Sequence, residues 1–301
     1  MNIPKARALF SAQTIRLEIL QESSIQSRSE AMTTLKDEIF LLYKQLDGHY
    51  VIKVYNRDNM EEVKDVIPLP GTDAQLMTGC NVSNCVYISL RQGDSLSLEV
   101  LRISRDAEQK FNVSPWINDR RMMSVSANGS LIIYSRLGGR HRDVVRIYKA
   151  NGSLQHEIKL PRDIRAWEYK NVIQKSNGNL VLAYVGIRDD HVTLTEVDLS
   201  GSAVRQFQSS IKHTEKSFVD VADESDRLMI GKPFEGIELL DSEFNLLGVY
   251  CLPNSDQRRR SLDHVDLRYD RNRNDIVRIH FDWSRHSVPL ANVVTLFRFT
   301  E

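Results

Sequence analysis

A glutamate between two aromatic residues is the side chain of this sequence best suited to proton transfer. Glu168 lies between Trp167 and Tyr169, whose rings can shield a carboxyl group from water and so raise its pKa toward neutrality. The cations of Lys170 and Arg165, nearby in the sequence, would lower that pKa instead. The sequence does not decide which effect prevails. Glu168 is therefore predicted to be either a general acid–base group or a permanently charged structural or metal-binding oxygen.

The neighbouring pair Asp263 and His264 is a second candidate for acid–base chemistry, because the carboxylate could orient the imidazole as a base. A calcium site would need several carboxylate and amide oxygens to converge. The available set is Glu30, Asp73, Glu168, Asn171 and Asp263. Calcium is expected only if the chain is an enzyme. The sequence contains no nucleophile elbow, Walker loop or His-Glu-x-x-His pattern.

A set of basic and aromatic residues could instead bind an anion. The residues predicted to contact it are Arg120, Arg121, Arg140, Arg142, Arg165, Trp167, Lys216, Arg258, Arg259 and Arg260. Basic loops steer anionic partners toward a protein, and Arg and Trp side chains stack on nucleic-acid bases. RNA, an acidic protein or a small phosphorylated ligand would each fit. The alternative is that these charges are simply solvated, since aspartates are interspersed among them.

Two of the three cysteines flank one short segment, Cys80-Asn-Val-Ser-Asn-Cys85. If this segment is a hairpin with a four-residue loop, the two cysteines lie opposite each other with Cβ atoms about 4.5–5.5 Å apart. That spacing is slightly long for a disulfide. The sequence favours two small buried apolar residues over a redox or metal role, because no second cysteine pair or nearby histidine completes a zinc site.

All of these residues belong to a pattern that returns six times. A half-apolar strand, a tight polar turn and a denser apolar strand recur with steps of 46, 45, 49, 48 and 47 residues. The turns fall at Lys36-Asp37, Ser83-Asn84, Asn128-Gly129, Asn177-Gly178, Ser225-Asp226 and Asn272-Arg273. A period near 47 from end to end is typical of a repeat architecture. The two Asn-Gly turns predict type I′ hairpins, in which both central residues have positive φ.

Each repeat continues with a third strand, another turn and a fourth strand, which is the pattern of a propeller blade. The sixth repeat ends at Glu301 without a fourth strand, whereas Thr14–Leu20 is an unmatched strand-like run at the start. The prediction is an all-β, six-bladed β-propeller of four-stranded antiparallel blades, a ring closed by an N-terminal strand that completes the last blade. The single domain, 1–301, would comprise a closing segment, 1–23, and blades at 24–70, 71–116, 117–163, 164–216, 217–258 and 259–301.

Three segments carry a resemblance to a known family: QKSNGNLVLA at 174–183, IYKANGSL at 147–154 and LLDSEFNLLG at 239–248. They resemble NHL-type six-bladed propellers. The hairpin from Cys80 to Cys85, followed by Val-Tyr-Ile, is similar to that of NHL-like propellers of invertebrate animals. The resemblance implies binding of proteins or RNA. Related six-bladed propellers include calcium-dependent lactonases and strictosidine-synthase-like enzymes.

Propeller geometry would collect the functional residues at one end of the blades. The innermost strands would begin at a central channel mouth, which would carry Glu30, Asp73, Gln75, Arg120, Arg121, Glu168, Lys170, Lys216, Asp263 and His264. The basic loops would lie at this same end, and acidic turns at the other. The expected function is non-catalytic recognition of an anionic partner through the basic loops. The alternative is a small-molecule enzyme, hydrolase/lactonase-like or strictosidine-synthase-like, with its active site at the channel mouth.

Composition limits the class of protein and the compartment that can be expected. The 301 residues carry equal numbers of acidic and basic side chains, and 41% of them are hydrophobic, enough for a packed core. No run of 18 apolar residues would span a membrane, and the start lacks the apolar stretch of a signal peptide. Three cysteines suit a reducing compartment. A cytoplasmic monomer is therefore expected.

Overall fold

The described part of the chain is built from β-strands. The computed structural model describes residues 17–25, 29–63, 67–69, 74–91, 98–104, 108–113, 121–135, 143–161, 164, 166–186, 190–212, 218–221, 225–232, 236–250, 265–270, 275–281 and 292–299. Within these ranges the strands form four-stranded antiparallel sheets, six in all. No helix among these residues has the length and apolar character needed to cross a membrane.

The chain divides into two compact units. The first unit, Ser27–Lys159, holds three sheets with the orders β2-β3-β4-β5, β6-β7-β8-β9 and β10-β11-β12-β13. Their strands are β2 Ser29–Leu35, β3 Glu38–Lys44, β4 Tyr50–Asn56, β5 Ile67–Pro68, β6 Ala74–Cys80, β7 Cys85–Arg91, β8 Leu98–Ser104, β9 Glu108–Val113, β10 Arg121–Val125, β11 Leu131–Ser135, β12 Val144–Tyr148 and β13 Leu154–Lys159.

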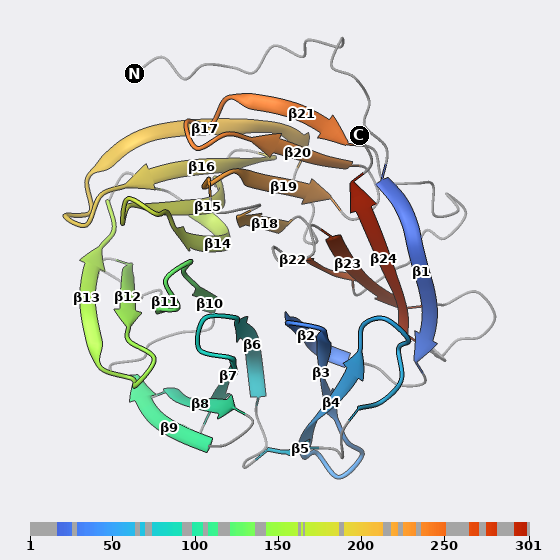
Figure 1. Ribbon diagram of the computed structural model, residues 1–301. Coiled ribbons are helices and arrows are strands. Elements are labelled where there is room, and N and C mark those ends of the chain that lie inside the picture. Colours follow the sequence, from blue (N-terminus) through green and yellow to red (C-terminus); the bar gives the residue numbers. More distant parts are fainter. Residues whose placement is uncertain are drawn as a thin grey trace. The chain divides into compact units, whose positions relative to one another are not determined.

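The second unit consists of Met1–Gln26 and Leu160–Glu301, and its sheets have the orders β14-β15-β16-β17, β18-β19-β20-β21 and β1-β24-β23-β22 (Figure 1). Its strands are β1 Leu17–Ile25, β14 Ala166–Gln174, β15 Leu180–Gly186, β16 His191–Val197, β17 Ala203–Lys212, β18 Phe218–Val221, β19 Leu228–Lys232, β20 Gly236–Leu240, β21 Leu246–Tyr250, β22 Val265–Asp270, β23 Asp275–Phe281 and β24 Asn292–Phe299.

In five of these sheets the four strands are consecutive in the sequence, and in the remaining one the N-terminal strand completes the C-terminal repeat. Strand β1 runs antiparallel to β24, from the pair Leu17 and Phe299 to the pair Ile25 and Asn292. The prediction that an N-terminal strand completes the last blade is confirmed. Its predicted range was too early, because the pairing continues through Ile25, beyond the residue 23 at which the closing segment was predicted to end. The fold is thus an all-β propeller of four-stranded antiparallel blades.

The Asn-Gly turns differ from the predicted type I′ geometry. Gly129 has a φ of +84°, but Asn128 is not among the residues with positive φ. The Gly129 N–H donates to the Ser126 carbonyl, and the Ser126 N–H donates to the Ser130 carbonyl, both at 2.9 Å. This is a three-residue loop, a type I turn followed by a left-handed glycine. Asn128 contributes its side-chain oxygen, which accepts the Ser130 N–H, rather than an unusual backbone angle. The turn around Gly178 has the same backbone hydrogen bonds.

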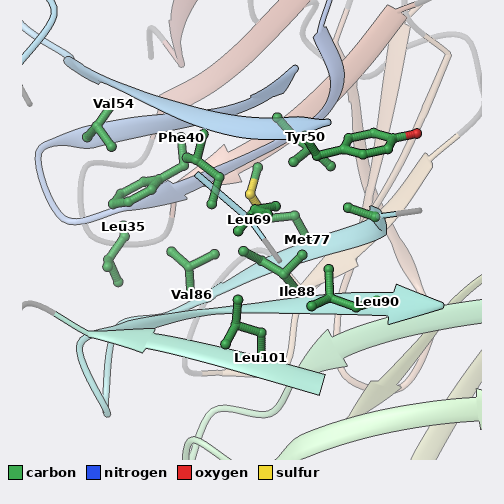
Figure 2. Close-up of a cluster of buried hydrophobic side chains, with 13 residues drawn as sticks. Leu35, Phe40, Tyr50, Val54, Leu69, Met77, Val86, Ile88, Leu90 and Leu101 are labelled. Atoms are coloured by element: carbon green, nitrogen blue, oxygen red, sulfur yellow. The ribbon is translucent and has the colours of Figure 1, made fainter. Parts of the chain in front are cut away.

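The hydrophobic core lies between successive sheets of each unit. Figure 2 shows the cluster between the first two sheets of the first unit, where side chains from β3 and β4 meet those from β6, β7 and β8. The second and third strands of a sheet are deeply packed: six residues are buried in β15, from Leu180 to Val185, and six in β16, from Val192 to Val197. Blades that pack on both faces explain why these strands are buried without alternation. The outer strand β13 is exposed at five of its six positions.

The first strands of consecutive sheets lie side by side within each unit: β2, β6 and β10 in the first, and β14, β18 and β22 in the second. Strands β2 and β6 approach so closely that a Cβ atom on Gly79 would lie 2.3 Å from the Thr34 carbonyl oxygen. The Gly79 N–H also donates to the Thr33 hydroxyl at 2.8 Å. A glycine is therefore required at this contact between inner strands.

Candidate functional site

The inner strands carry β-bulges at the end where the channel-mouth residues were predicted. In β2 the register shifts between Ser29 and Ala31, so Glu30 has no partner in β3. In β6 it shifts between Ala74 and Leu76, which leaves Gln75 without a partner in β7. A bulge adds one unpaired residue and locally changes the direction of the strand, and bulges are frequent next to functional sites.

Strand β14 carries two such irregularities. The register shifts between Ala166 and Glu168, leaving Trp167 unpaired, and between Tyr169 and Asn171, leaving Lys170 unpaired. Glu168 pairs with Val185 between the two shifts. The residue with the best predicted chemistry thus lies in the most irregular segment of any inner strand that the structure describes.

These irregularities share one position in the repeat. Glu30, Gln75 and Trp167 are each the second residue of their strand, 45 and 92 residues apart, which is one and two repeats. Three of the residues predicted at the channel mouth, Glu30, Gln75 and Lys170, are bulged residues. The sequence analysis named them but did not predict the bulges.

Side-chain hydrogen bonds hold the bulged segments in place. Beside the β6 bulge, the Leu76 N–H donates to the hydroxyl of Ser89, a fully buried residue, at 3.0 Å. Below the β14 bulges, the Asn171 amide N–H donates to the Val219 carbonyl of β18 at 2.8 Å. The Asn171 side-chain oxygen in turn accepts the Val172 N–H at 2.8 Å. The strand starts are thus anchored to rigid neighbours, as a binding site requires.

Asn171 was one of the five predicted oxygen ligands for calcium. Its amide nitrogen instead links β14 to β18, and its amide oxygen accepts a hydrogen bond from the backbone of its own strand. Among the described residues, no group of three or more His, Cys, Asp or Glu side chains is arranged to hold a metal ion. Asp73 and Asp263 lie outside the described ranges, so the calcium site stays a prediction.

The structure places only part of the predicted site. Glu168 and Trp167 lie in β14, and Arg121 is the first residue of β10, paired with Ser135. The other predicted catalytic and ligand-binding residues lie outside the described ranges: Asp263, His264, Arg120, Arg140, Arg142, Arg165, Lys216, Arg258, Arg259 and Arg260.

Sequence reasoning missed the anchoring residues Ser89 and Thr33. Ser89 was missed because a single hydroxyl in an apolar strand gives no signal in the sequence. Thr33 was missed because its partner Gly79 lies 46 residues away.

Comparison with known proteins shows the fold and no closer relationship. No protein-family model matches the sequence, and no curated protein matches it; the resemblance to NHL-type repeats therefore stays a prediction. Similar solved structures include a gluconolactonase from Xanthomonas campestris, with a TM-score of 0.54 and 11% identity over 98% of this chain and 96% of that one.

Two further structures show the same architecture. A protein from Lactobacillus plantarum has a TM-score of 0.51 and 14% identity, with 92% of this chain and 89% of that chain covered. A protein of unknown function from Bacteroides caccae has a TM-score of 0.52 and 12% identity, with 77% and 80% covered. Identities this low establish the propeller fold alone.

Proposed function

We propose that the sheets close into a single six-bladed ring and that the protein is a small-molecule hydrolase with its site where the inner strands begin. The observation that carries this proposal is the bulge at the second position of β2, β6 and β14. A bulge costs ladder hydrogen bonds and is frequent next to functional sites, so bulges at the positions of predicted functional residues support a site at these strand starts. The distant likeness to a gluconolactonase makes a lactone the first substrate class to test.

Hydrolysis of a lactone needs a base for the attacking water and a cation for the carbonyl oxygen. Glu168 is proposed as the base and Lys170 as the cation, because both lie in the irregular start of β14. Water attacks the carbonyl carbon as Glu168 takes its proton; the ring C–O bond then breaks and the leaving alkoxide receives the proton. General base catalysis of this kind contributes about 10²–10⁴-fold to the rate.

The experiment measures proton release from a panel of γ- and δ-lactones by the purified chain. Glu168→Gln should retain the fold and lose at least tenfold in kcat. Glu243→Gln, at an exposed turn between β20 and β21, is the matched control and should keep full activity. Full kcat in Glu168→Gln would show that Glu168 has a structural role and is not the base. No turnover of any lactone above the buffer rate would exclude the hydrolase proposal.

Recognition of an anionic partner by the basic loops is the second proposal. It is supported by the concentration of arginines in the predicted loops, with Arg258, Arg259 and Arg260 as its densest run. Changing all three to Glu should leave stability nearly unchanged. It should weaken retention on heparin or RNA and reduce the salt dependence of binding. Equal elution of variant and parent would show that these arginines are solvated and do not bind the anionic partner.

A further inference from the structure

Two free cysteines face each other across the hairpin between β6 and β7. Cys80 ends β6 and Cys85 begins β7, and the two are direct partners in the ladder, as the sequence predicted. Their exposed fractions are 1% and 0%. The two thiols are hydrogen-bonded to each other. The prediction that both cysteine side chains are buried is confirmed. Their contacts are not purely apolar, because the Cys80 sulfur also accepts a backbone hydrogen bond.

The surroundings make the two sulfur atoms unequal. The hydrogen bond from the Cys85 thiol is the largest of the effects that lower the pKa of Cys80 to about 6. The backbone N–H of Ser83 adds a second hydrogen bond to the same sulfur at 3.4 Å. The pKa of Cys85 is raised, because Cys85 is the donor of the pair and is buried beside Cys80. Cys80 is therefore the more acidic thiol of the pair and the one that more readily supplies a thiolate.

Charged and titratable neighbours complete the environment. Arg102 of β8 donates to the Ser83 carbonyl at 3.4 Å, and its positive charge acts on Cys85, where it partly offsets the effects that raise the pKa of that thiol. Tyr87 follows on β7, and burial raises its pKa, so it stays neutral. Tyr148 of β12 packs in the same buried cluster. The Gly129 carbonyl oxygen accepts a hydrogen bond from the Cys80 thiol at 3.8 Å and, like burial, favours the protonated form, but the hydrogen bonds that Cys80 accepts outweigh these effects.

The hairpin that carries the two thiols reaches water at its tip. Its four residues run from 81 to 84, and Val82 at the tip is 65% exposed. Because the two thiols are exposed by only 1% and 0%, a small oxidant such as hydrogen peroxide suits this site better than a bulky disulfide.

We propose that Cys80 and Cys85 form a reversible disulfide on reaction with hydrogen peroxide. The Cys80 thiolate attacks one peroxide oxygen, the O–O bond breaks, and hydroxide leaves, giving a sulfenic acid. The Cys85 sulfur then attacks the Cys80 sulfur, and the sulfenic oxygen leaves as water with the Cys85 proton. In total two thiols and one peroxide give one disulfide and two waters. Ladder partners are slightly too far apart for a relaxed disulfide, so this bond is readily reduced again.

Oxidation at this hairpin affects contacts to both neighbouring sheets of the first unit. The Asn81 side chain accepts the Lys36 N–H of the first sheet at 3.2 Å. The Cys80 sulfur lies 3.8 Å from the Gly129 carbonyl oxygen of the third sheet. Closing the disulfide draws the strand ends together and moves atoms that touch both sheets. The redox state of one hairpin is thereby coupled to the packing of three blades.

The test uses the full chain with Cys251→Ser, which leaves only this cysteine pair. The protein is treated with a small molar excess of hydrogen peroxide at pH 7, unfolded in urea, alkylated with N-ethylmaleimide and weighed by mass spectrometry. We expect two alkylated thiols before oxidation, none after it, loss of two hydrogens, and full recovery with dithiothreitol. Two alkylated thiols after treatment, or added oxygen without loss of both thiols, would overturn the proposal.

Single variants assign the roles of the two sulfurs. Cys85→Ala should stop at a Cys80 sulfenic acid that dimedone traps, while Cys80→Ala should react at least tenfold more slowly. Equal rates in the two variants would contradict the assigned order. In the parent, oxidation should slow about tenfold between pH 7 and pH 5, because the thiolate fraction of a group with a pKa of about 6 falls by that factor. An ordinary thiol with a pKa near 8.5 would slow about a hundredfold.

Discussion

A buried lysine that joins two sheets of the second unit gives the sharpest test of the packing described above. The Lys175 ammonium, whose side chain is 5% exposed, lies 3.1 Å from a carboxylate oxygen of Glu196, which is 2% exposed. It also donates to the Ser242 carbonyl at 2.8 Å. Lys175 follows β14, Glu196 belongs to β16 and Ser242 lies between β20 and β21. Lys175→Met removes the charge and both hydrogen bonds while keeping most of the apolar side chain.

The structure sets the size of the loss. Removing one partner of a buried ion pair typically costs about 3–5 kcal/mol, because the other charge stays buried. Here Glu196 keeps a hydrogen bond from the Asn179 amide at 2.7 Å and a contact with Arg205 at 3.4 Å, which favours the lower limit. The lost bond to Ser242 adds about 1 kcal/mol. We expect Lys175→Met to lower the free energy of unfolding by about 3–4 kcal/mol at pH 7.

The loss should depend on pH with a definite sign. Burial alone would raise the pKa of Glu196, but hydrogen bonds from Asn179 and Lys175 and the charges of Lys175 and Arg205 outweigh it and lower the pKa below 4.5. A lowered folded-state pKa stabilises the protein above the unfolded value and loses that contribution as pH falls through the folded value. The difference between parent and Lys175→Met should therefore be full at pH 7 and shrink below about pH 4.5.

The assay is urea unfolding of the parent and variants at pH 7 and pH 4. Lys149→Met, at an exposed lysine of another hairpin turn, is the matched control and should change stability by less than about 0.5 kcal/mol. Lys175→Met combined with Glu196→Leu should be less destabilised than the sum of the two single variants. A loss below 1 kcal/mol in Lys175→Met, or strict additivity, would refute the buried-pair interpretation.

Three further predictions test other contacts between strands and between sheets. Deleting residues 1–26 removes β1 from the β24 edge and should cost several kcal/mol, comparable to the stability of a whole domain; an unchanged melting temperature would contradict it. Gly79→Ala should cost about 2–3 kcal/mol in urea unfolding, since its Cβ would collide with the Thr34 carbonyl; a neutral effect would show that β2 and β6 can separate freely. Asp226→Asn should cost about 1 kcal/mol, because both carboxylate oxygens accept the Ser176 N–H at 2.9 Å; equal stability of Asp226→Asn and the parent would rule out this inter-sheet link.

The repeat and the closing strand could be predicted because they depend on patterns that the sequence states directly. A period near 47 with paired apolar runs leaves few alternatives to four-stranded blades. The unmatched strand at one end and the missing strand at the other imply the pairing of β1 with β24. The turn type was wrong because Asn-Gly fits two geometries, and the number of loop residues between Ser126 and Ser130 decides between them.

The links between sheets could not be predicted, because they join residues 50 and 67 positions apart with no local signal. Asp226 resembles any turn aspartate in the sequence, yet its carboxylate binds Ser176, 50 residues earlier. Lys175 occupies a polar turn that suggests an exposed side chain, yet it is buried against Ser242, 67 residues away. Bulges are similarly hidden, since one extra residue at a polar strand start leaves the apolar pattern intact.

Departures from regularity are the best guide to function in a chain built from repeats. Repeats that share one packing role converge on one backbone pattern, so a position where a single repeat differs is held by something other than packing. Strands β2 and β6 each carry one bulge, whereas β14 carries two, at Trp167 and Lys170. The second bulge in β14 has no counterpart in the register of β2 or β6. Glu168 lies between the two, and the Asn171 amide fixes the strand below them. This segment is therefore the first place to look for the chemistry.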